Sequence, residues 1–289
     1  GNKVDILGKR KIWYTFSGIV IAIGLLFLLI NGLNLGIDFN GGTLMEFNFD
    51  HRVTTEQIRS LLEEIEIAEE SKIQHSESSG TNGVIIRAKS LKSEQILEIS
   101  NAVEEEFESS EMMRTEMVGP TIGQELRINA LLAMLVASIA IVIYISFRFE
   151  FRFAAVSIIT LLHDVLITIG IFAILGREVN TPFVAALLTI VGYSINDTIV
   201  IFDRIRENMK LMHRVPFIEQ ANTAVVDTLP RSINTSITTL ITILAIYFFG
   251  GASIQTFMLA LFIGMFAGTY SSIFVASPLL VTWQNRVSR

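Results

Sequence analysis

Six long apolar runs constrain this chain more than any other feature of its sequence. A helix needs about 20 mainly apolar residues to cross the hydrocarbon core of a bilayer, and almost no charged side chain interrupts the runs. They cover residues 12–30, 128–147, 153–175, 182–202, 233–249 and 254–281. The sequence therefore predicts a polytopic α-helical membrane protein with six transmembrane helices. No small-residue cleavage site follows the first run, which we interpret as a retained helix.

The distribution of lysine and arginine predicts the orientation in the membrane. These residues precede the first run, lie between the second and third and between the fourth and fifth, and follow the sixth, whereas the opposite short loops contain a single arginine. Basic residues are enriched in cytoplasmic loops. Residues 1–11, 203–230 and 282–289 are therefore predicted to be cytoplasmic, and residues 31–127 extracytoplasmic. The 203–230 loop contains two amphipathic stretches, which we expect to lie along the inner membrane surface.

The extracytoplasmic segment is predicted to fold as a small α+β domain. Its hydrophobic period alternates between two and about 3.6 residues. This pattern predicts strands at 43–49, 72–76, 83–88 and 112–118 and helices at 55–67 and 94–107. Thr54 and Gln57 have the spacing of a capping box at the start of the first helix. The order strand, helix, strand, strand, helix, strand is the ferredoxin-like pattern.

Several polar side chains interrupt the apolar runs, where an ionisable group costs several kcal/mol unless it faces the bundle interior. On the fourth run, Thr189, Tyr193, Asn196 and Asp197 lie on one helical stripe. A second polar stripe begins just before the fifth run and extends into it; it consists of Arg231, Asn234, Thr235 and Thr238. Two polar stripes in lipid are expected to pack against each other.

The sequence alone leaves two possible roles for each of the ionisable residues. Asp197 is either a working proton carrier or a hydrogen-bonded structural group. Arg231 is either its partner or a positive residue just below the membrane, because Pro230 beside it suits a helix end. His163 and Asp164, near the middle of the third run, are either a structural pair or a proton-handling pair.

The sixth run contains Gly264, Gly268 and Ser272 at intervals of four, which predicts close helix packing. No motif of a soluble enzyme is present, so no catalytic residue is proposed. The chain has no cysteine and only four scattered histidines, which predicts no metal site and no bound cofactor. Its net charge of -6 gives no reason to expect a nucleic-acid partner.

Five stretches together resemble the SecD/SecF family of protein-export membrane proteins, in particular its SecF members, within the resistance-nodulation-division superfamily. They are residues 36–43 (GIDFNGGT), 118–123 (VGPTIG), 162–165 (LHDV), 191–204 (VGYSINDTIVIFDR) and 229–232 (LPRS). Their order along the chain matches the order of elements in that family.

The resemblance implies a subunit that works with SecD beside the SecYEG channel in the bacterial cytoplasmic membrane. Such proteins use the proton motive force to help a translocating preprotein move outward, with protons as the coupling ion. Carried over by position, Asp197 is the proton-binding carboxylate and Arg231 its cationic neighbour. We expect protonation of Asp197 to release Arg231 and to move the outer domain through a hinge at Gly41 and Gly42.

Other interpretations remain open. The chain is alternatively a half-transporter of the same superfamily that exports lipids or small molecules, or a passive subunit that stabilises a channel complex. It is also either a separate subunit or the second half of a fused SecD–SecF polypeptide.

Overall fold

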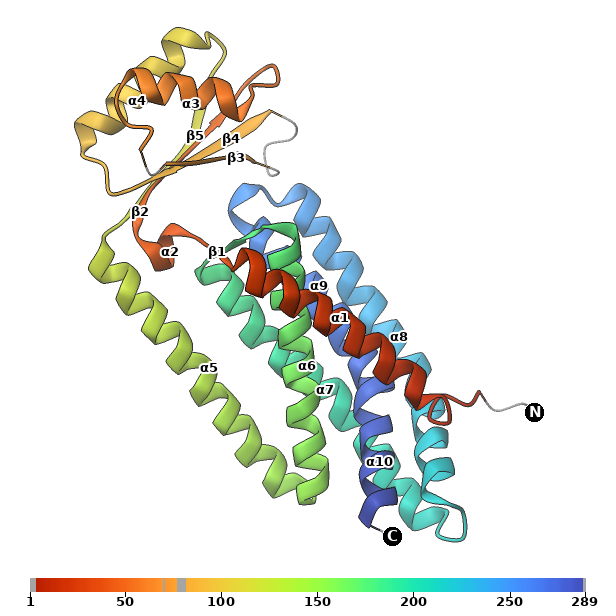
Figure 1. The fold of residues 1–289 in the computed structure, drawn as a ribbon. Coiled ribbons are helices and arrows are strands. Elements are labelled where there is room, and N and C mark those ends of the chain that lie inside the picture. Colours follow the sequence, from red (N-terminus) through yellow and green to blue (C-terminus); the bar gives the residue numbers. More distant parts are fainter. Residues whose placement is uncertain (1–3, 70, 77–81, 288–289) are drawn as a thin grey trace. The chain divides into compact units, whose positions relative to one another are not determined.

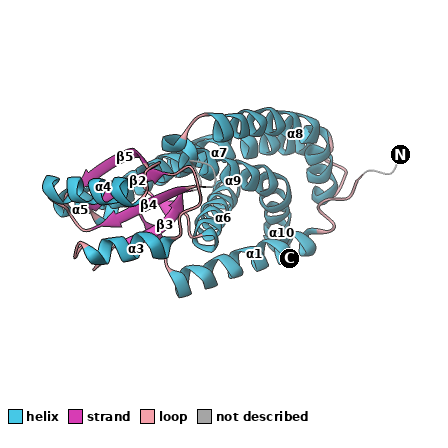
Figure 2. Cartoon of the chain, turned by 90° about the horizontal axis from the view of Figure 1, so that it is seen from above, coloured by secondary structure: helices cyan, strands magenta, loops and turns pink. Residues whose placement is uncertain are grey.

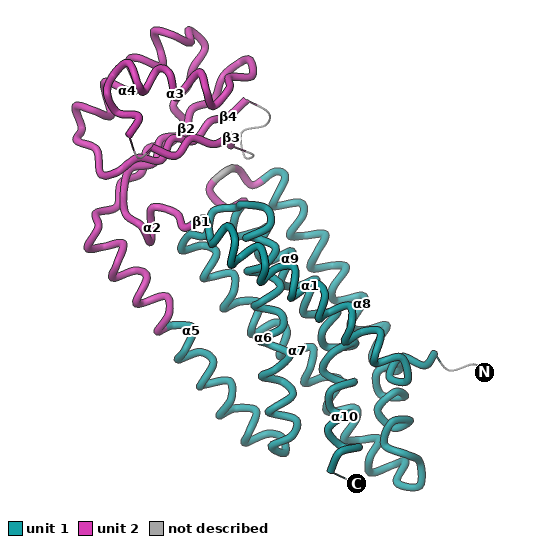
Figure 3. Tube along the Cα trace, in the orientation of Figure 1, with its two compact units in different colours: residues 1–34, 133–249, 256–289 teal, residues 35–132, 250–255 magenta. Residues whose placement is uncertain are grey.

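The computed structural model describes residues 4–69, 71–76 and 82–287 of the chain. Two compact units are present (Figure 3). Unit 1 comprises residues 1–34, 133–249 and 256–289, and unit 2 comprises residues 35–132 and 250–255.

Unit 1 is a bundle of long helices (Figures 1 and 2). Six candidate membrane spans are present among the described residues, one for each predicted apolar run. The first five are α1 (Arg10–Asn31), α5 (Pro120–Arg148), α6 (Phe151–Leu175), α7 (Thr181–Leu211) and α8 (Phe217–Phe249). The sixth consists of α9 (Gln255–Ser271), a π-helical turn η2 (Ser272–Ala276) and α10 (Ser277–Val287). Three short elements connect the spans: β1 (Asn34–Leu35), β6 (Glu178–Val179) and the 3₁₀ turn η1 (Ala252–Ile254).

Residues 203–230 were predicted to form a separate loop whose amphipathic stretches lie along the membrane surface. The structure differs from this prediction. The two amphipathic stretches are helical, but they continue α7 and α8, and Pro230 lies inside α8 rather than at its end. The two extensions pack together through buried apolar residues, including Ile205 and Val225, and through polar contacts. Arg204 and Asp227 form an ion pair at 2.8 Å, and Asn208 Nδ2 donates to the Gln220 carbonyl at 3.0 Å.

Helices α1 and α6 approach each other closely at a pair of glycines. A Cβ atom added to Gly24 would lie 2.9 Å from the Cα atom of Gly170, and a Cβ added to Gly170 would meet Gly24 at the same distance. Only glycine fits both positions, because real Cβ atoms do not approach backbone this closely. The two backbones are therefore in direct contact inside the predicted membrane region.

Unit 2 has the predicted ferredoxin-like topology. Its elements are β2 (Gly42–Asn48), α3 (Thr55–Glu64), β3 (Lys72–Ser76), β4 (Gly83–Ala88), α4 (Ser93–Glu106) and β5 (Glu111–Val118). The strand order is β3-β4-β2-β5 and each neighbouring pair is antiparallel. The capping box is confirmed, since Thr54 Oγ1 accepts from the Gln57 amide and Gln57 Oε1 accepts from the Thr54 amide. Helix α3 ends earlier than predicted, before Glu66, whose φ of 59° is left-handed.

Gly41 and Gly42 lie where the chain passes from the short helix α2 (Ile37–Asn40) into β2. Both have positive φ, and a Cβ on Gly42 would lie 2.4 Å from the Ala88 carbonyl oxygen. A Cβ on Gly123, in α5, would lie 2.9 Å from the Gly41 nitrogen. Left-handed backbone at Gly41 and Gly42, and close packing at all three positions, explain why glycine occupies them. The hinge role stays a prediction.

We predict that Gly24→Ala lowers the free energy of unfolding by about 1–3 kcal/mol, the usual cost of overpacking. The matched control is Gly18→Ala in the same helix, where an added Cβ meets nothing within 4 Å. Gly18→Ala should leave stability unchanged or raise it slightly through helix propensity. Unfolding of both variants in detergent is the measurement. Equal stability of the two variants would show that the α1–α6 contact is not tight.

Candidate functional site

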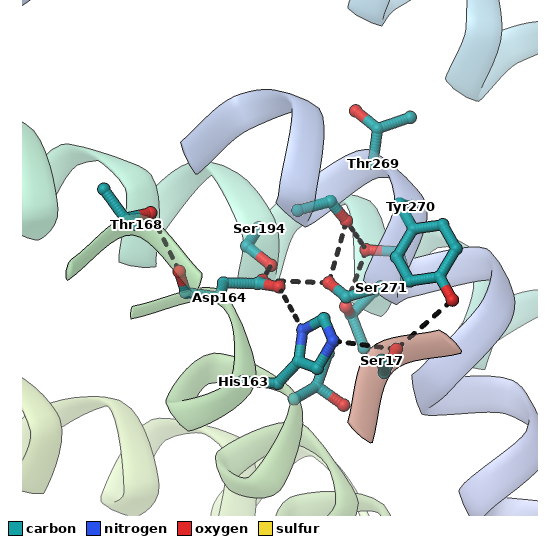
Figure 4. Close-up of polar contacts among 12 residues, drawn as sticks. Ser17, His163, Asp164, Thr168, Ser194, Thr269, Tyr270 and Ser271 are labelled. Atoms are coloured by element: carbon teal, nitrogen blue, oxygen red, sulfur yellow. Dashed lines mark hydrogen bonds and ion pairs between the residues drawn. The ribbon is translucent and has the colours of Figure 1, made fainter. Parts of the chain in front are cut away.

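The carboxylate of Asp164 is the centre of a buried polar network in unit 1 (Figure 4). Asp164 lies in α6 and is 0% exposed. Its Oδ2 accepts hydrogen bonds from Ser194 Oγ of α7 at 2.6 Å and from Ser271 Oγ of α9 at 2.9 Å. Its Oδ1 lies 3.0 Å from Nδ1 of the neighbouring His163. One carboxylate thus joins three helices.

The imidazole of His163 extends this network to α1. Its Nε2 lies 3.0 Å from Ser17 Oγ, and Ser17 Oγ lies 3.2 Å from the hydroxyl of Tyr270 in α9. The Tyr270 hydroxyl donates to the Trp13 carbonyl at 3.3 Å, and its ring stacks on that of His163. His163 and Asp164 therefore connect four helices, α1, α6, α7 and α9.

A second contact between α7 and the sixth span lies one helical turn from this centre. Thr198 Oγ1 of α7 is 3.0 Å from Ser272 Oγ, at the first residue of the π-helical turn. Gly268 and Gly264 let the backbones approach, because Cβ atoms there would meet Ser194 at 3.2 Å and overlap the Ile190 side chain. Turns of π-helix are frequently found at functional sites. Here the turn places Ser271 and Ser272 next to α6 and α7.

Asp197 has a different environment from Asp164. It lies in α7 and is 8% exposed, and its buried Oδ2 has no hydrogen-bond partner among the described residues. The same holds within the described chain for the hydroxyls of Tyr193, one turn earlier in α7, and of Ser232 in α8. Arg231 is near enough for its charge to act on Asp197, although the described residues show no ion pair between them. Asp197 is thus buried with one carboxylate oxygen that has no hydrogen-bond partner among the described residues.

The other predicted polar residues of these two helices lie on the surface of the chain. Asn196, Arg231, Asn234, Thr235 and Thr238 are exposed, as is Thr189. Thr238 satisfies its hydroxyl locally, by donating to the carbonyls of Asn234 and Thr235 at 2.9 Å. The expectation that the polar stripes of the fourth and fifth runs pack against each other is therefore wrong for most of their length. They form an exposed polar face on α7 and α8, which we call the α7/α8 polar face.

Four residues of the network were absent from the sequence-based site: Ser17, Ser194, Tyr270 and Ser271. A single serine in an apolar run carries no signal, because its hydroxyl can bond to the backbone of its own helix. A lone tyrosine does not show which helix its hydroxyl reaches. The spacing within one run does not show which residues of other runs face it. His163 and Asp164 were detectable because ionisable groups in a span require partners.

Ser17, His163 and Asp164 are arranged like the side chains of a serine hydrolase triad, but the surroundings do not suit that chemistry. A triad needs free N–H groups beside the serine to stabilise an oxyanion. Ser17 lies in the interior of α1, where backbone N–H groups are used in the helix. Among the described residues no three histidine, aspartate or glutamate side chains come together to hold a metal ion.

Six spans around a buried ionisable network, together with a ferredoxin-like domain, define a polytopic membrane protein of the transport class. Comparison with known proteins specifies the family. Residues 98–286 match the family described as "Protein export membrane protein SecD/SecF, C-terminal", and residues 26–51 match the "SecD/SecF GG Motif". The chain belongs to the SecD/SecF family of protein-export membrane proteins.

Similar proteins include separate and fused subunits. The chain is 41% identical to the protein translocase subunit SecF of Thermobaculum terrenum, over 98% of this chain and 95% of the relative. It is 39% identical to the protein translocase subunit SecDF of Bacillus subtilis, over 99% of this chain and 39% of the relative. The crystal structure of SecDF from Thermus thermophilus, described as a translocon-associated membrane protein, has a TM-score of 0.91 at 40% identity, covering 98% of this chain and 39% of that one. The chain thus spans almost all of the SecF relative and less than half of the fused proteins.

We predict that Asp164→Ala destabilises unit 1 more than the double substitution His163→Leu with Asp164→Leu. Removing one member of a buried pair typically costs about 3–5 kcal/mol, because it leaves the other member unpaired. Apolar replacement of both members is often close to neutral. Denaturant unfolding in detergent measures the difference. A double variant that is less stable than Asp164→Ala would show that the hydrogen bonds, rather than the unpaired group, dominate the energy.

Proposed function

We propose that the chain is a SecF-type subunit of the Sec protein-export machinery, which works with SecD and uses the proton motive force to help preproteins cross the membrane. Family membership and the six spans support this role. The single observation that supports proton coupling is the buried carboxylate of Asp197 with an unbonded oxygen.

The contrast between the two buried aspartates favours Asp197 as the proton carrier. Asp164 Oδ2 accepts from Ser194 and Ser271, and its Oδ1 lies 3.0 Å from His163 Nδ1, so both of its oxygens have partners. Asp197 Oδ2 accepts none within the described chain, and an unsatisfied buried oxygen costs about 1–3 kcal/mol, more when charged. Protonation relieves this cost at Asp197. A group that must gain and lose a proton in each cycle benefits when neither its charged nor its protonated form is strongly favoured.

The proposed cycle begins when a proton binds Asp197 and removes its negative charge. The attraction of Arg231 for α7 then falls, and α7 and α8 repack. One proton that crosses the membrane releases about 2.3 kcal/mol per 100 mV, which is sufficient to bias a two-state movement. Helix α5 offers a route to unit 2, since residues 120–132 belong to unit 2 and residues 133–148 of the same helix to unit 1.

The exposure of the α7/α8 polar face supports the proposal that SecD binds the chain within the membrane. Asn196, Arg231 and Asn234 are exposed on it in the isolated chain. Charged and amide groups that face lipid tails are costly, whereas helices of a partner can supply polar contacts. Fused SecDF relatives contain a matching segment within a longer polypeptide. We therefore propose that SecD covers this face, with the SecYEG channel and the preprotein as further partners.

The distribution of basic residues supports a multi-pass arrangement in the bacterial cytoplasmic membrane, with both termini cytoplasmic and unit 2 on the outer side. In that arrangement the extended ends of α7 and α8 project into the cytoplasm, and unit 2 is on the side where a preprotein emerges.

We predict that Asp197→Asn abolishes the part of preprotein export that depends on the proton gradient. Asparagine keeps the size of the side chain but cannot change its charge. The measurement is gradient-dependent export by inverted membrane vesicles that contain the assembled complex. The control is Ser157→Ala, which removes a buried hydroxyl of α6 that bonds to the Phe153 carbonyl. Undiminished export with Asp197→Asn would refute the proton role and favour a passive assembly subunit.

We also predict that SecD protects Thr238→Cys from a membrane-permeant thiol reagent. The chain has no native cysteine, so the labelling reports one site. The control is Phe266→Cys in α9, an exposed apolar position outside the α7/α8 polar face. Labelling of Thr238→Cys should fall when SecD is co-expressed, while that of Phe266→Cys stays constant. Equal labelling with and without SecD would place the partner elsewhere.

A further inference from the structure

An apolar groove in unit 1 lies between α1, α6 and α9, apart from the α7/α8 polar face. Its apolar lining includes Phe16 and Val20 of α1, Ile171 of α6, and Phe262 and Phe266 of α9. Two lining residues carry hydroxyls, Ser17 and Tyr270, and their oxygen atoms lie 3.2 Å apart, within hydrogen-bonding distance of each other. An occupant of this groove therefore meets an apolar wall and needs to be apolar itself.

The helices that border the groove carry positive charge at one end and no negative charge. Neither α1 nor the sixth span contains an aspartate or glutamate. Their basic residues, at the start of α1 and in the last turn of α10, are Lys9, Arg10, Lys11 and Arg286. These two ends are neighbours, because the Tyr14 hydroxyl of α1 lies 2.8 Å from Thr282 Oγ1 of α10. The apolar groove thus lies beside a cationic helix end.

The spacing along α1 directs one lysine to the side of the groove. Lys9 precedes Phe16 by seven residues, about two helical turns, so the two lie on the same side of α1. Lys11 precedes Val20 by nine residues, about two and a half turns, and lies on the opposite side. Between Lys9 and the groove is Trp13, a residue type enriched at the interface of a membrane. Lys9 forms no ion pair within the described chain.

We propose that this groove binds an acyl chain of an anionic phospholipid, whose phosphate group lies at Lys9. The proposal is independent of the role in export.

The length of the groove favours an acyl chain over a helix of another protein. Every α1 residue that lines the groove lies in the half of the helix nearer Lys9. From Lys9 to Val20 the helix rises about 16 Å. This is close to half of the hydrocarbon core, about 15 Å, which is the depth that one acyl chain reaches from its head group. A transmembrane helix crosses the whole core and would not match a contact of half that length.

The charge of the helix end favours an anionic head group. A helix from a partner would have to supply an acidic residue at this depth, whereas anionic lipids are constituents of the membrane surface. Each lysine or arginine near that surface increases the attraction for such lipids by a factor of about five. A zwitterionic lipid carries no net charge and gains little from Lys9. The groove and the lysine together therefore specify a phospholipid with net negative charge.

Tryptophan fluorescence tests the proposal, because bromine atoms on an acyl chain quench a tryptophan that they contact. The chain has two tryptophans, so Trp283→Phe leaves Trp13 as the only one. This variant is reconstituted in phosphatidylcholine bilayers with a rising mole fraction of brominated phosphatidylglycerol or, in a parallel series, of brominated phosphatidylcholine. We expect half-maximal quenching at a mole fraction about fivefold lower for the anionic lipid.

Two outcomes of this titration would overturn the proposal. Equal curves for the two lipids would mean that only unselective bilayer lipid reaches Trp13. No quenching by either lipid would mean that the groove has another occupant, such as a helix from a second copy of the chain.

A matched pair of lysine variants locates the head group. In the Trp283→Phe background, Lys9→Gln should remove the fivefold preference for the anionic lipid, because it removes the charge on the side of the groove. Lys11→Gln removes the same charge from the opposite side of α1 and should keep the preference. An equal loss in both variants would show that general surface charge, rather than a site at Lys9, attracts the lipid.

A second pair tests the groove itself. Val20→Phe enlarges a side chain that lines the groove and should remove the preference by excluding the acyl chain. Ile19→Phe makes a similar change at the adjacent position, which is 54% exposed and outside the lining, and should leave the preference unchanged. An unchanged preference in folded Val20→Phe would place the acyl chain elsewhere. If Val20→Phe does not fold, the two lysine variants still decide the proposal, since both alter exposed residues.

Discussion

The absence of water inside a bilayer is the constraint on which this structure depends. Without water, a charged side chain must find its partners within the protein. Asp164 meets this requirement through Ser194, Ser271 and His163, which come from three helices, and His163 adds Ser17 from a fourth. The cost of leaving any of these groups unpaired fixes how the helices are rotated toward one another. Small residues then permit the contact, as at Gly24 against Gly170.

Asp197 departs from this pattern, and the departure is informative. It is almost as buried as Asp164, yet its Oδ2 and the nearby Tyr193 hydroxyl lack partners in the described chain. In a natural protein such groups need an explanation, and a functional role or a missing partner is the usual one. The proposed proton role is an explanation of the first kind, and the proposed contact of the exposed α7/α8 polar face with SecD is one of the second. The satisfied pair bonds to α7 at Ser194, and the unsatisfied carboxylate of Asp197 lies about one turn further along the same helix.

Much of the fold was predictable because local rules determine it. Six apolar runs were enough for six spans, and the alternation of hydrophobic periods gave the ferredoxin-like topology of unit 2. The capping box at Thr54 followed from two residues. The lengths of α7 and α8 were not predictable, since Pro230 suggested a helix end and the stabilising Arg204–Asp227 pair is tertiary. The site was predictable only in part. Asp197, His163 and Asp164 stand out as ionisable residues in lipid, whereas Ser17 and Tyr270 matter only because α1 and α9 bring them to His163.

The packing around Gly41 and Gly42 limits the movement that the predicted hinge allows. A hinge needs backbone freedom, but Gly41 and Gly42 are packed against Pro120, Gly123 and Ala88 within contact distance. Arg127 adds a hydrogen bond to the Phe39 carbonyl at 2.8 Å. These contacts join the start of α5 to the entry of β2, so a rotation at the glycine pair would break them all. The glycine pair is therefore part of the attachment of the first turns of α5 to the β2 entry within unit 2, and any movement at the predicted hinge has to break this packing.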